Sequence, residues 1–316
     1  IIFFTLKFMD NKIFLKKNIL KIFTFLIFLI LFTVLFWPYL WDDPLGNFLH
    51  AIKDMSYHVW TGSVFYLGNS ISALNLPWHY SIVWMSVTIP IIYLFFFILG
   101  SFLIFKRLFK RFLNLSTKNN FNELWRGNKE RMDIIFFLIF YFTLFLIIEL
   151  NSVLYGGWRH LYFIYPCLIY MAIRGLEFFS RKFFSKYLIV LIAPFLLYTS
   201  YWMLKNHPYQ FLYFNNLAGN NITNNFDLDY WGTSNKSALT YITTHDKRDK
   251  LNIYVSSVSP YHFSLLLMDR NNRKRLHFVE NINKADFLVT NHYYQRGSPT
   301  IINNKLKKEF ELFYEF

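Results

Sequence analysis

A stretch between residues 205 and 240 combines aromatic side chains with carboxylates and amides. Its two densest parts read HPYQFLYFNNLAGN (residues 207–220) and FDLDYWGTSNKS (residues 226–237). Carboxylates accept hydrogen bonds from sugar hydroxyls, and indole and phenol rings combine an apolar face with a polar edge. The residues that suit a sugar or acceptor site in this way are Tyr209, Asp227, Asp229, Tyr230 and Trp231. The same composition also suits a rigid connector, and the sequence leaves both interpretations open.

A cationic group, Trp158-Arg159-His160, lies in a short polar segment between two apolar stretches. A guanidinium binds phosphate through two parallel N–H bonds, which suits Arg159 and His160 to the phosphate of a membrane lipid. Trp158 can stack on a ligand or anchor the chain at the membrane interface. Glu149, near the end of the preceding apolar stretch, is a plausible ion-pair partner for Arg159. A purely structural anchor or ion pair is the alternative.

The other reactive residue types give weaker indications. Asp42-Asp43 can bind a metal or act as a base, or it can cap the helix that follows. Cys167 is the single cysteine, so an intrachain disulfide and a metal-thiolate cluster are excluded, and we expect it to be buried. Glycine-rich phosphate loops and the HExxH, GxSxG and CxxC motifs are absent from the sequence, so we predict neither a metal nor a cofactor.

The elements that position these residues are expected to lie in a membrane. Charged residues make up only 16% of the chain and apolar residues 54%, which is too apolar for an ordinary soluble domain. Five stretches are long enough to span a bilayer, at residues 20–39, 81–105, 133–150, 160–178 and 186–204. Pro90, Pro166 and Pro194 fall inside these spans and are expected to kink them, with neighbouring groups satisfying the freed carbonyls.

The net charge of +14 follows the membrane topology rather than a nucleic-acid site. Lysine and arginine gather before the first span, in the loop 106–132 and around 179–185, whereas 40–80 contains only Lys53 and 151–160 only Arg159. The positive-inside rule then places the basic segments in the cytoplasm. It places residues 40–80, 151–159 and the C-terminal region outside, and we predict no nucleic-acid partner.

Three regions follow from these patterns. Residues 1–204 are predicted to form the membrane bundle, residues 205–240 a juxtamembrane connector, and residues 241–316 a small α/β domain outside the membrane. Strands are expected at 251–258, 275–280 and 285–291, and a helix at 260–269. In the outer loop, a helix after Asp43-Pro44 carries Leu45, Phe48, Leu49, Ile52 and Met55 on one face. That helix lies either on the membrane surface or against the bundle.

The first residues, IIFF, resemble the end of an apolar helix, and the order of basic and apolar parts is not that of a signal peptide. We expect further spans to precede residue 1, with a start at Met9 as the alternative.

Four motifs occur in a characteristic order: WPYLWDDPLGNFLHAI, GNSISALNLPWHY, YGGWRHLYFIYP and HPYQFLYFNNLAGN with FDLDYWGTS. Together they resemble the C-terminal half of bacterial family 39 integral-membrane glycosyltransferases, the group similar to protein mannosyltransferases and aminoarabinose transferases, with the GT-C fold. The resemblance covers about residues 17–240. It implies an all-α polytopic membrane bundle followed by a small α/β extracytoplasmic domain.

The resemblance also implies an activity. Such enzymes transfer a sugar, with inversion, from a polyprenyl-phosphate carrier to a glycan, lipid or protein acceptor outside the inner membrane. Their catalytic aspartate lies in the first outer loop, which we expect to precede this sequence, so catalysis is not carried over to Asp42 or Asp43. A multi-span transporter or lipid flippase, and a non-catalytic membrane scaffold, are the alternative functions.

Overall fold

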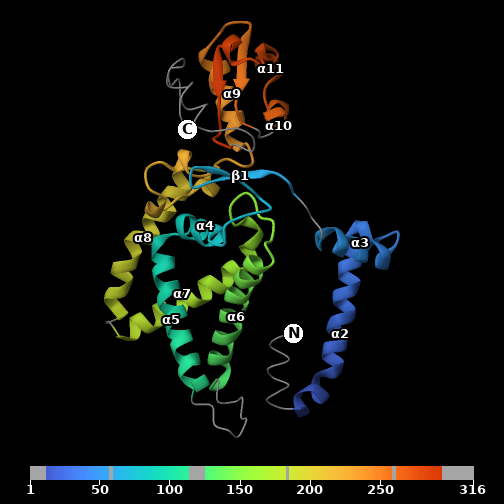
Figure 1. Cartoon of the computed structure of the whole chain (residues 1–316), viewed down its shortest axis with the longest axis vertical. Helices are drawn as coiled ribbons and strands as arrows, with labels where there is room; N and C mark the ends of the chain where they lie inside the picture. Colours follow the sequence, from blue (N-terminus) through green and yellow to red (C-terminus); the bar gives the residue numbers. More distant parts are fainter. Residues whose placement is uncertain (1–11, 57–59, 114–124, 183–184, 258–260, 294–316) are drawn as a thin grey trace. The chain divides into compact units, whose positions relative to one another are not determined.

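A computed structural model of the chain describes residues 12–56, 60–113, 125–182, 185–257 and 261–293 (Figure 1). The chain divides into two compact units. One unit comprises residues 1–60 and 101–142, and the other comprises residues 61–100 and 143–316.

Four segments of the described residues are long and apolar enough to cross a membrane, by length and composition. They lie in α2 (Lys12–Phe36), α5 (Ile91–Leu113), α6 (Gly127–Glu149) and the run Arg159–Arg181, formed by η3 (Arg159–Ile164) and α7 (Tyr165–Lys182). A helix satisfies its backbone polar groups internally, as a lipid environment requires. None of the apolar window of α2, Ile19–Phe36, is buried by protein. The chain therefore has the features of a helical membrane protein, as its composition predicts.

The predicted span 81–105 is two helices. α4 (Tyr80–Thr88) ends before Pro90, and α5 begins at Ile91. Ile89 has an extended backbone, with φ −97° and ψ 137°, which is the conformation that a following proline favours. Pro90 therefore breaks the segment instead of kinking it.

The other two prolines behave differently from each other. Pro166 lies in the first turn of α7, where the missing N–H has no helical partner to lose, so the kink expected there is wrong. Pro194 lies inside α8 (Ser185–Lys205), the helix that corresponds to the predicted fifth span. α8 is not one of the four segments that meet the length and hydropathy criteria over the described residues.

The helices α5, α7 and α8 share an apolar core within their unit. Phe96 of α5 and Ala172 of α7 are buried at its centre. The residues packed around this pair are Ile92, Phe97, Leu99, Leu176, Phe179 and Ile192.

A short hairpin that the sequence patterns did not reveal lies between α3 (Pro44–Ser56) and α4. Its strands, β1 (Ser63–Tyr66) and β2 (Asn69–Ser72), are antiparallel, and the turn residues Leu67 and Gly68 both have positive φ, at 48° and 79°. Tyr66 is buried and hydrogen-bonded through Oη to Nδ1 of His79 at 2.6 Å. Burial raises the pKa of Tyr66 to about 12, so this hydroxyl stays protonated at neutral pH.

The C-terminal part is a small α/β arrangement, as predicted. Its parallel strands β3 (Leu251–Val255), β4 (Leu276–Phe278) and β5 (Phe287–Val289) have the order β4-β3-β5. The connecting helices are α10 (Tyr261–Leu266) and α11 (Arg270–Arg275). These elements are shorter than the predicted ranges. An additional helix, α9 (Thr233–His245), packs Leu239 and Ile242 onto the sheet residues Leu251, Ile253, Leu276 and Val289.

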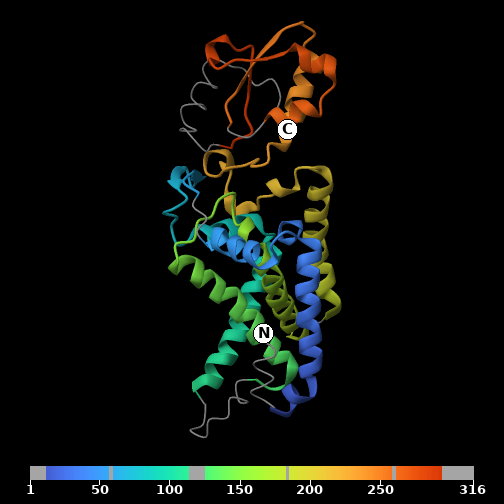
Figure 2. The ribbon, with the colours of Figure 1, turned by 90° about the vertical axis from the view of Figure 1, so that its right-hand side faces the viewer.

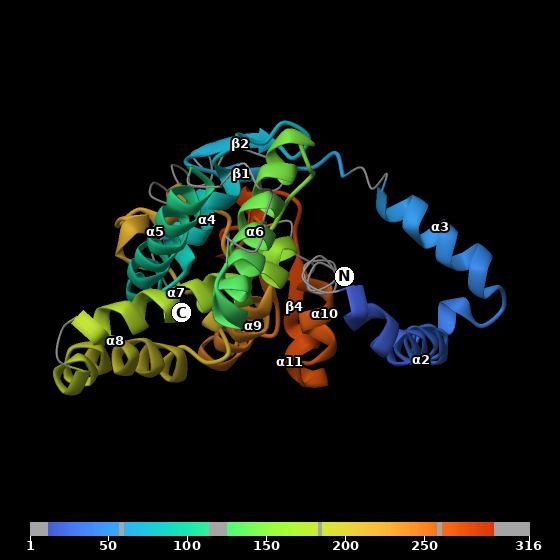
Figure 3. The ribbon, with the colours of Figure 1, turned by 90° about the horizontal axis from the view of Figure 1, so that it is seen from below.

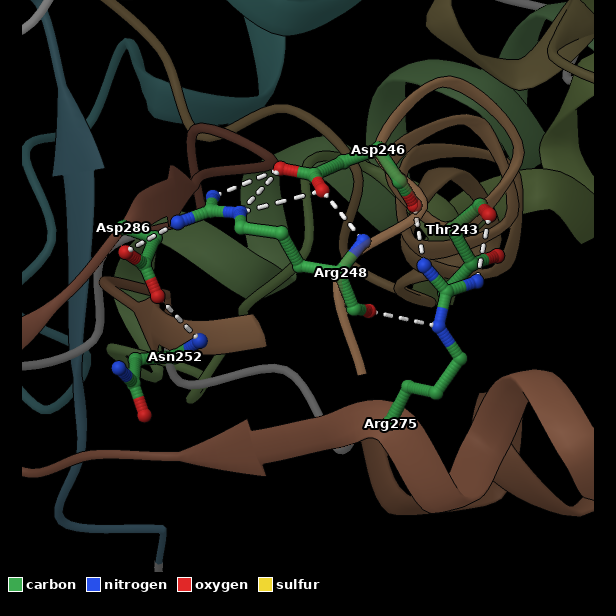
Figure 4. Close-up of polar contacts among 6 residues, drawn as sticks. All are labelled: Thr243, Asp246, Arg248, Asn252, Arg275 and Asp286. Carbon is green, nitrogen blue, oxygen red and sulfur yellow. Dashed lines mark hydrogen bonds and ion pairs between the residues drawn. The ribbon is translucent and has the colours of Figure 1, made fainter. Parts of the chain in front are cut away.

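A polar network lies at the N-terminal ends of the strands of this sheet (Figure 4). Arg248 binds Asp246 at 2.7 Å and Asp286 at 3.0 Å, and Asp286 also accepts the backbone N–H of Asn252 at 2.7 Å. Arg275 donates to the carbonyls of Thr243, Asp246 and Arg248, near the C-terminal end of α9. A cation at that end complements the unpaired carbonyls of the helix.

Candidate functional site

A tight glycine turn places Arg159 at the start of the fourth candidate span. Gly156 and Gly157 have φ values of 63° and 71°, in the left-handed region that glycine tolerates. A Cβ at position 156 would lie 3.3 Å from Nε of Arg159 and 3.4 Å from Cδ2 of Tyr230. The turn therefore lets the arginine side chain fold back against its own backbone and against Tyr230.

Three aromatic rings surround the guanidinium of Arg159. Its Cζ lies 4.6 Å from the ring centroid of Tyr155, 4.2 Å from that of Tyr230 and 5.4 Å from that of Trp231. Such distances give cation–π attraction. Nη2 donates to Oη of Tyr230 at 3.1 Å, whereas Nε is buried and has no hydrogen-bond partner among the described residues. We call Tyr155, Arg159, Tyr230 and Trp231 the arginine cage.

The cage joins segments about 70 residues apart in the sequence, and each side is held by its own contacts. Asp229, which precedes Tyr230, accepts hydrogen bonds from the amides of Thr233 and Ser234 and from the Ser234 hydroxyl, at 2.6–3.0 Å. Nδ2 of Asn291 donates to the Asp229 carbonyl at 2.8 Å. The ring of Tyr293 meets that of Tyr230 edge-on at 5.1 Å. The residues after β5 therefore fix the position of Tyr230.

Searches against protein-family models, curated proteins and solved structures find no match to this chain.

The sequence singled out three of the four cage residues. Arg159 was predicted to bind phosphate, and Tyr230 and Trp231 to bind a sugar or acceptor; the structure brings them into contact. Trp231 is 63% exposed, so its ring remains available to a ligand. Tyr155 was not singled out from the sequence. It lies four positions before Arg159, across the Gly156-Gly157 turn, and this spacing could have predicted the contact.

Asp227 and Asp229 were predicted as possible sugar ligands, but in the structure both are buried against the backbone. The Asp227 carboxylate accepts the amide of Phe65 at 2.7 Å, and its own amide donates to the Phe65 carbonyl at 3.1 Å. Asp229 caps α9 as described above. We assign both carboxylates a structural role, because a buried carboxylate that already accepts backbone N–H groups is poorly placed to bind a sugar.

The remaining predicted residues lie around the cage or away from it. Trp158 is buried and donates from Nε1 to Oγ1 of Thr88 at 2.8 Å, so it anchors the turn to α4. His160 is exposed, and its ring lies 4.7 Å from that of Tyr155. Tyr209 contacts α9 instead, through a 2.6 Å hydrogen bond between its hydroxyl and that of Ser237.

The structure corrects the expected partner of Glu149 and confirms one of the two alternatives for Asp43. The ion pair expected between Glu149 and Arg159 is not found among the described residues, since the guanidinium meets aromatic rings and Glu149 is exposed at the end of α6. Asp43 accepts the amide of Gly46 at 3.0 Å through Oδ1, at the beginning of α3. The structure therefore shows the helix-cap arrangement for Asp43, and not a paired acidic site.

Sequence reasoning missed the role of Asn215. This buried residue donates from Nδ2 to the carbonyls of Ser86 and Ile89 at 2.7 and 2.6 Å, and its amide donates to the Val87 carbonyl at 2.8 Å. These carbonyls lie where Pro90 interrupts the helix and provides no N–H. The connector thereby satisfies the broken end of α4, which is the compensation expected for proline in a membrane segment.

An apolar pocket lies in the same unit as the cage. Its lining is mostly apolar and includes Leu76, Trp78, Ile82, Ile147, Ile148 and Leu154, with Ser81, Asn151 and Ser152 as polar members. Leu154 is the residue before Tyr155 of the cage.

Proposed function

We propose that the chain is a membrane glycosyltransferase whose arginine cage binds the phosphate of a polyprenyl-phosphate-linked sugar. The observation that carries the proposal is the guanidinium of Arg159. It lies at the first residue of a candidate span, and it keeps a buried Nε–H without a partner among the described residues. A phosphate there would complete the hydrogen bonding of a partly buried cation.

The cage chemistry suits the departure of a phosphate. In the proposed reaction an acceptor hydroxyl attacks the anomeric carbon, a base takes its proton, and the bond between that carbon and the phosphate oxygen breaks. Negative charge then grows on the phosphate, where a fixed guanidinium stabilises it most. We assign the role of base to none of the described residues. The exposed ring of Trp231 provides a face for the sugar, and His160 a second polar contact.

The apolar pocket supports the lipid part of the proposal. Seven of its lining side chains are Leu, Ile or Trp, and two of them, Ile147 and Ile148, belong to the last turn of the candidate span in α6. Such a lining accepts hydrocarbon and excludes water. We propose that the carrier chain lies there.

In this proposal the protein lies in the inner membrane, and α8 forms a fifth membrane span. α8 would return the chain to the outer side, so that the connector and the α/β region lie outside the membrane. The basic segments at 106–132 and 179–185 would then be cytoplasmic. The acceptor is a glycan, a lipid or a protein, and the membrane lipids are the remaining partners.

Donor binding by the full chain in membrane vesicles tests this function. With a labelled polyprenyl-phosphate sugar, Arg159→Ala should weaken binding by about tenfold or more, because a hydrogen bond to a charged group contributes about 1.5–3 kcal/mol. Arg181→Ala is the matched control, since Arg181 is an exposed arginine at the other end of the same segment and pairs with Glu177. Equal donor binding by Arg159→Ala and the control, at equal folding, would overturn the assignment. Movement of the lipid across the bilayer without sugar transfer would favour a flippase.

A further inference from the structure

The helix α3 presents an apolar face that no described residue covers fully. Leu45, Phe48, Leu49, Ile52 and Met55 recur at helical spacing, and each is between 40% and 78% exposed. The opposite face is polar, and on it Nδ1 of His50 lies 3.1 Å from a carboxylate oxygen of Asp54. A helix with one apolar and one polar face suits a boundary between water and hydrocarbon.

Three contacts attach the first half of α3 to the end of α2. Nδ2 of Asn47 donates to the Tyr39 carbonyl at 2.7 Å, and the Tyr39 hydroxyl lies 3.1 Å from Nδ1 of His50. The rings of Trp37 and Phe48 meet edge-on, with 6.5 Å between centroids. These contacts hold α3 to the turn η1 (Pro38–Leu40), which follows α2 directly.

A further hydrogen bond fixes the residues around η1 to the C-terminal end of α2: Nε1 of Trp41 donates to the Val34 carbonyl at 3.0 Å. Figures 2 and 3 show the result: α3 runs crosswise to α2 at its end, and when α2 is seen along its axis, α3 is seen along its length. A helix crosswise to a membrane span, at the end of that span, lies along the membrane plane.

The apolar face contacts the end of the span at Phe48. Phe48 belongs to this face, and its ring partner Trp37 is the first residue after α2. Trp37, Tyr39 and Trp41 have the aromatic composition of a membrane–water interface. Lys53 lies at the border of the apolar face, where a long cationic side chain can reach headgroup phosphates.

We propose that α3 is an interfacial helix, with its apolar face buried in the lipid at the end of α2 and its His50–Asp54 face in water. Its partner is the bilayer itself. The proposal does not depend on the proposed catalytic function.

Spin labels at two positions of the full chain in phospholipid vesicles test the proposal. A background Cys167→Ser variant allows single labels at Leu49→Cys on the apolar face and at Asp54→Cys on the polar face. Collision rates with oxygen, which partitions into lipid, and with a water-soluble nickel complex then report the surroundings of each label. The oxygen-to-nickel ratio should be several-fold higher at position 49 than at position 54.

Two results would overturn the proposal. Equal, water-like ratios at both positions would show that the face is not in lipid. Exclusion of both reagents from position 49 would show that protein covers it, as in packing against the bundle or a partner. Leu45→Cys provides a second label on the same face, at a residue that is 71% exposed, should the label at position 49 disturb the helix.

Discussion

Gly100 of α5 and Gly175 of α7 lie against each other's helix backbone. A Cβ on Gly100 would lie 1.9 Å from the Met171 carbonyl oxygen, and a Cβ on Gly175 would lie 2.1 Å from the Phe96 carbonyl oxygen. The two helices therefore approach as closely as glycine permits, which is a common way for membrane helices to gain packing without a hydrophobic driving force.

Alanine at either glycine should destabilise the bundle. Both helix backbones would have to shift, because the contacts are with backbone atoms that cannot rotate away. We expect Gly100→Ala and Gly175→Ala each to lower stability by about 1–3 kcal/mol, as for overpacked cores. Thermal unfolding of the full chain in detergent would measure this. Ile173→Ala is the control, because Ile173 belongs to the same helix and is 55% exposed. Unfolding temperatures equal to that of the control would contradict the close crossing.

The helix break at Pro90 should depend on Asn215. Asn215→Asp keeps the size of the side chain but replaces the donor by a carboxylate facing the carbonyls of Ser86 and Ile89. The free energy of unfolding should fall by more than about 1–3 kcal/mol, which is the cost of leaving one buried polar group without its partner. Asn216→Asp is the matched control, since Asn216 is exposed. A similar unfolding midpoint for both variants would show that Asn215 does not hold the break.

Two substitutions at Tyr230 distinguish the ring contact with Arg159 from the hydrogen bond with it. Tyr230→Phe keeps the ring 4.2 Å from the guanidinium and removes the 3.1 Å hydrogen bond. We expect the loss of this hydrogen bond from a charged group to lower the stability of the protein by about 1.5–3 kcal/mol. Tyr230→Leu also removes the cation–π contact, which should add about 0.5–2 kcal/mol. Donor binding in vesicles should weaken in the same order. A phenylalanine variant that binds as poorly as the leucine variant would contradict a role for the ring.

Acid should loosen the α/β region. Hydrogen bonds from Arg248 hold the pKa of Asp246 below its usual range. The pKa of Asp286 is also lowered, mainly by the hydrogen bond from the amide of Asn252 and further by Arg248. A lowered folded-state pKa stabilises the fold fully above the unfolded-state pKa of about 3.9, and the contribution disappears as pH falls through the folded-state value. Both groups are near the surface, so we expect a modest effect.

Hydrogen exchange of β3, corrected for the pH dependence of the intrinsic rate, would measure this effect. Protection should be steady from pH 7 to about 5 and should fall below about pH 4. Asp286→Asn should lose part of that pH dependence, because the amide cannot ionise. Unchanged protection at pH 3 would contradict the contribution of the network.

Four of the five predicted spans overlap segments that are long and apolar enough to cross a membrane, because each is a continuous apolar run. At Pro90 the sequence predicted the correct position but a kink in place of a break. The hairpin was missed although Leu67-Gly68 is a recognisable turn, because its strands are only four residues each. α9 was missed because its sequence, TSNKSALTYITTH, has few apolar residues. Both elements were missed because the sequence pattern within each of them is short or weak.

The roles of Asp227, Asp229 and Asn215 could not be predicted for a different reason. Each binds backbone atoms, and for Asp227 and Asn215 those atoms lie more than 100 residues away. The spacing of residues along the sequence does not predict such distant backbone partners. Arg159 and Tyr230 could be placed on the same side of the membrane from charge and order, but their contact requires the Gly156-Gly157 turn and the capped start of α9.

The Tyr293–Tyr230 contact also orders events during synthesis. Arg159 and Tyr155 leave the ribosome more than 130 residues before Tyr293, and Tyr230 has its final neighbours only once Asn291 and Tyr293 have arrived. A nascent or truncated chain that stops before β5 can therefore insert its spans while its cage is incomplete. The surroundings of Tyr230 are therefore complete only after the last described strand has been synthesised, so formation of the cage follows the folding of the α/β region.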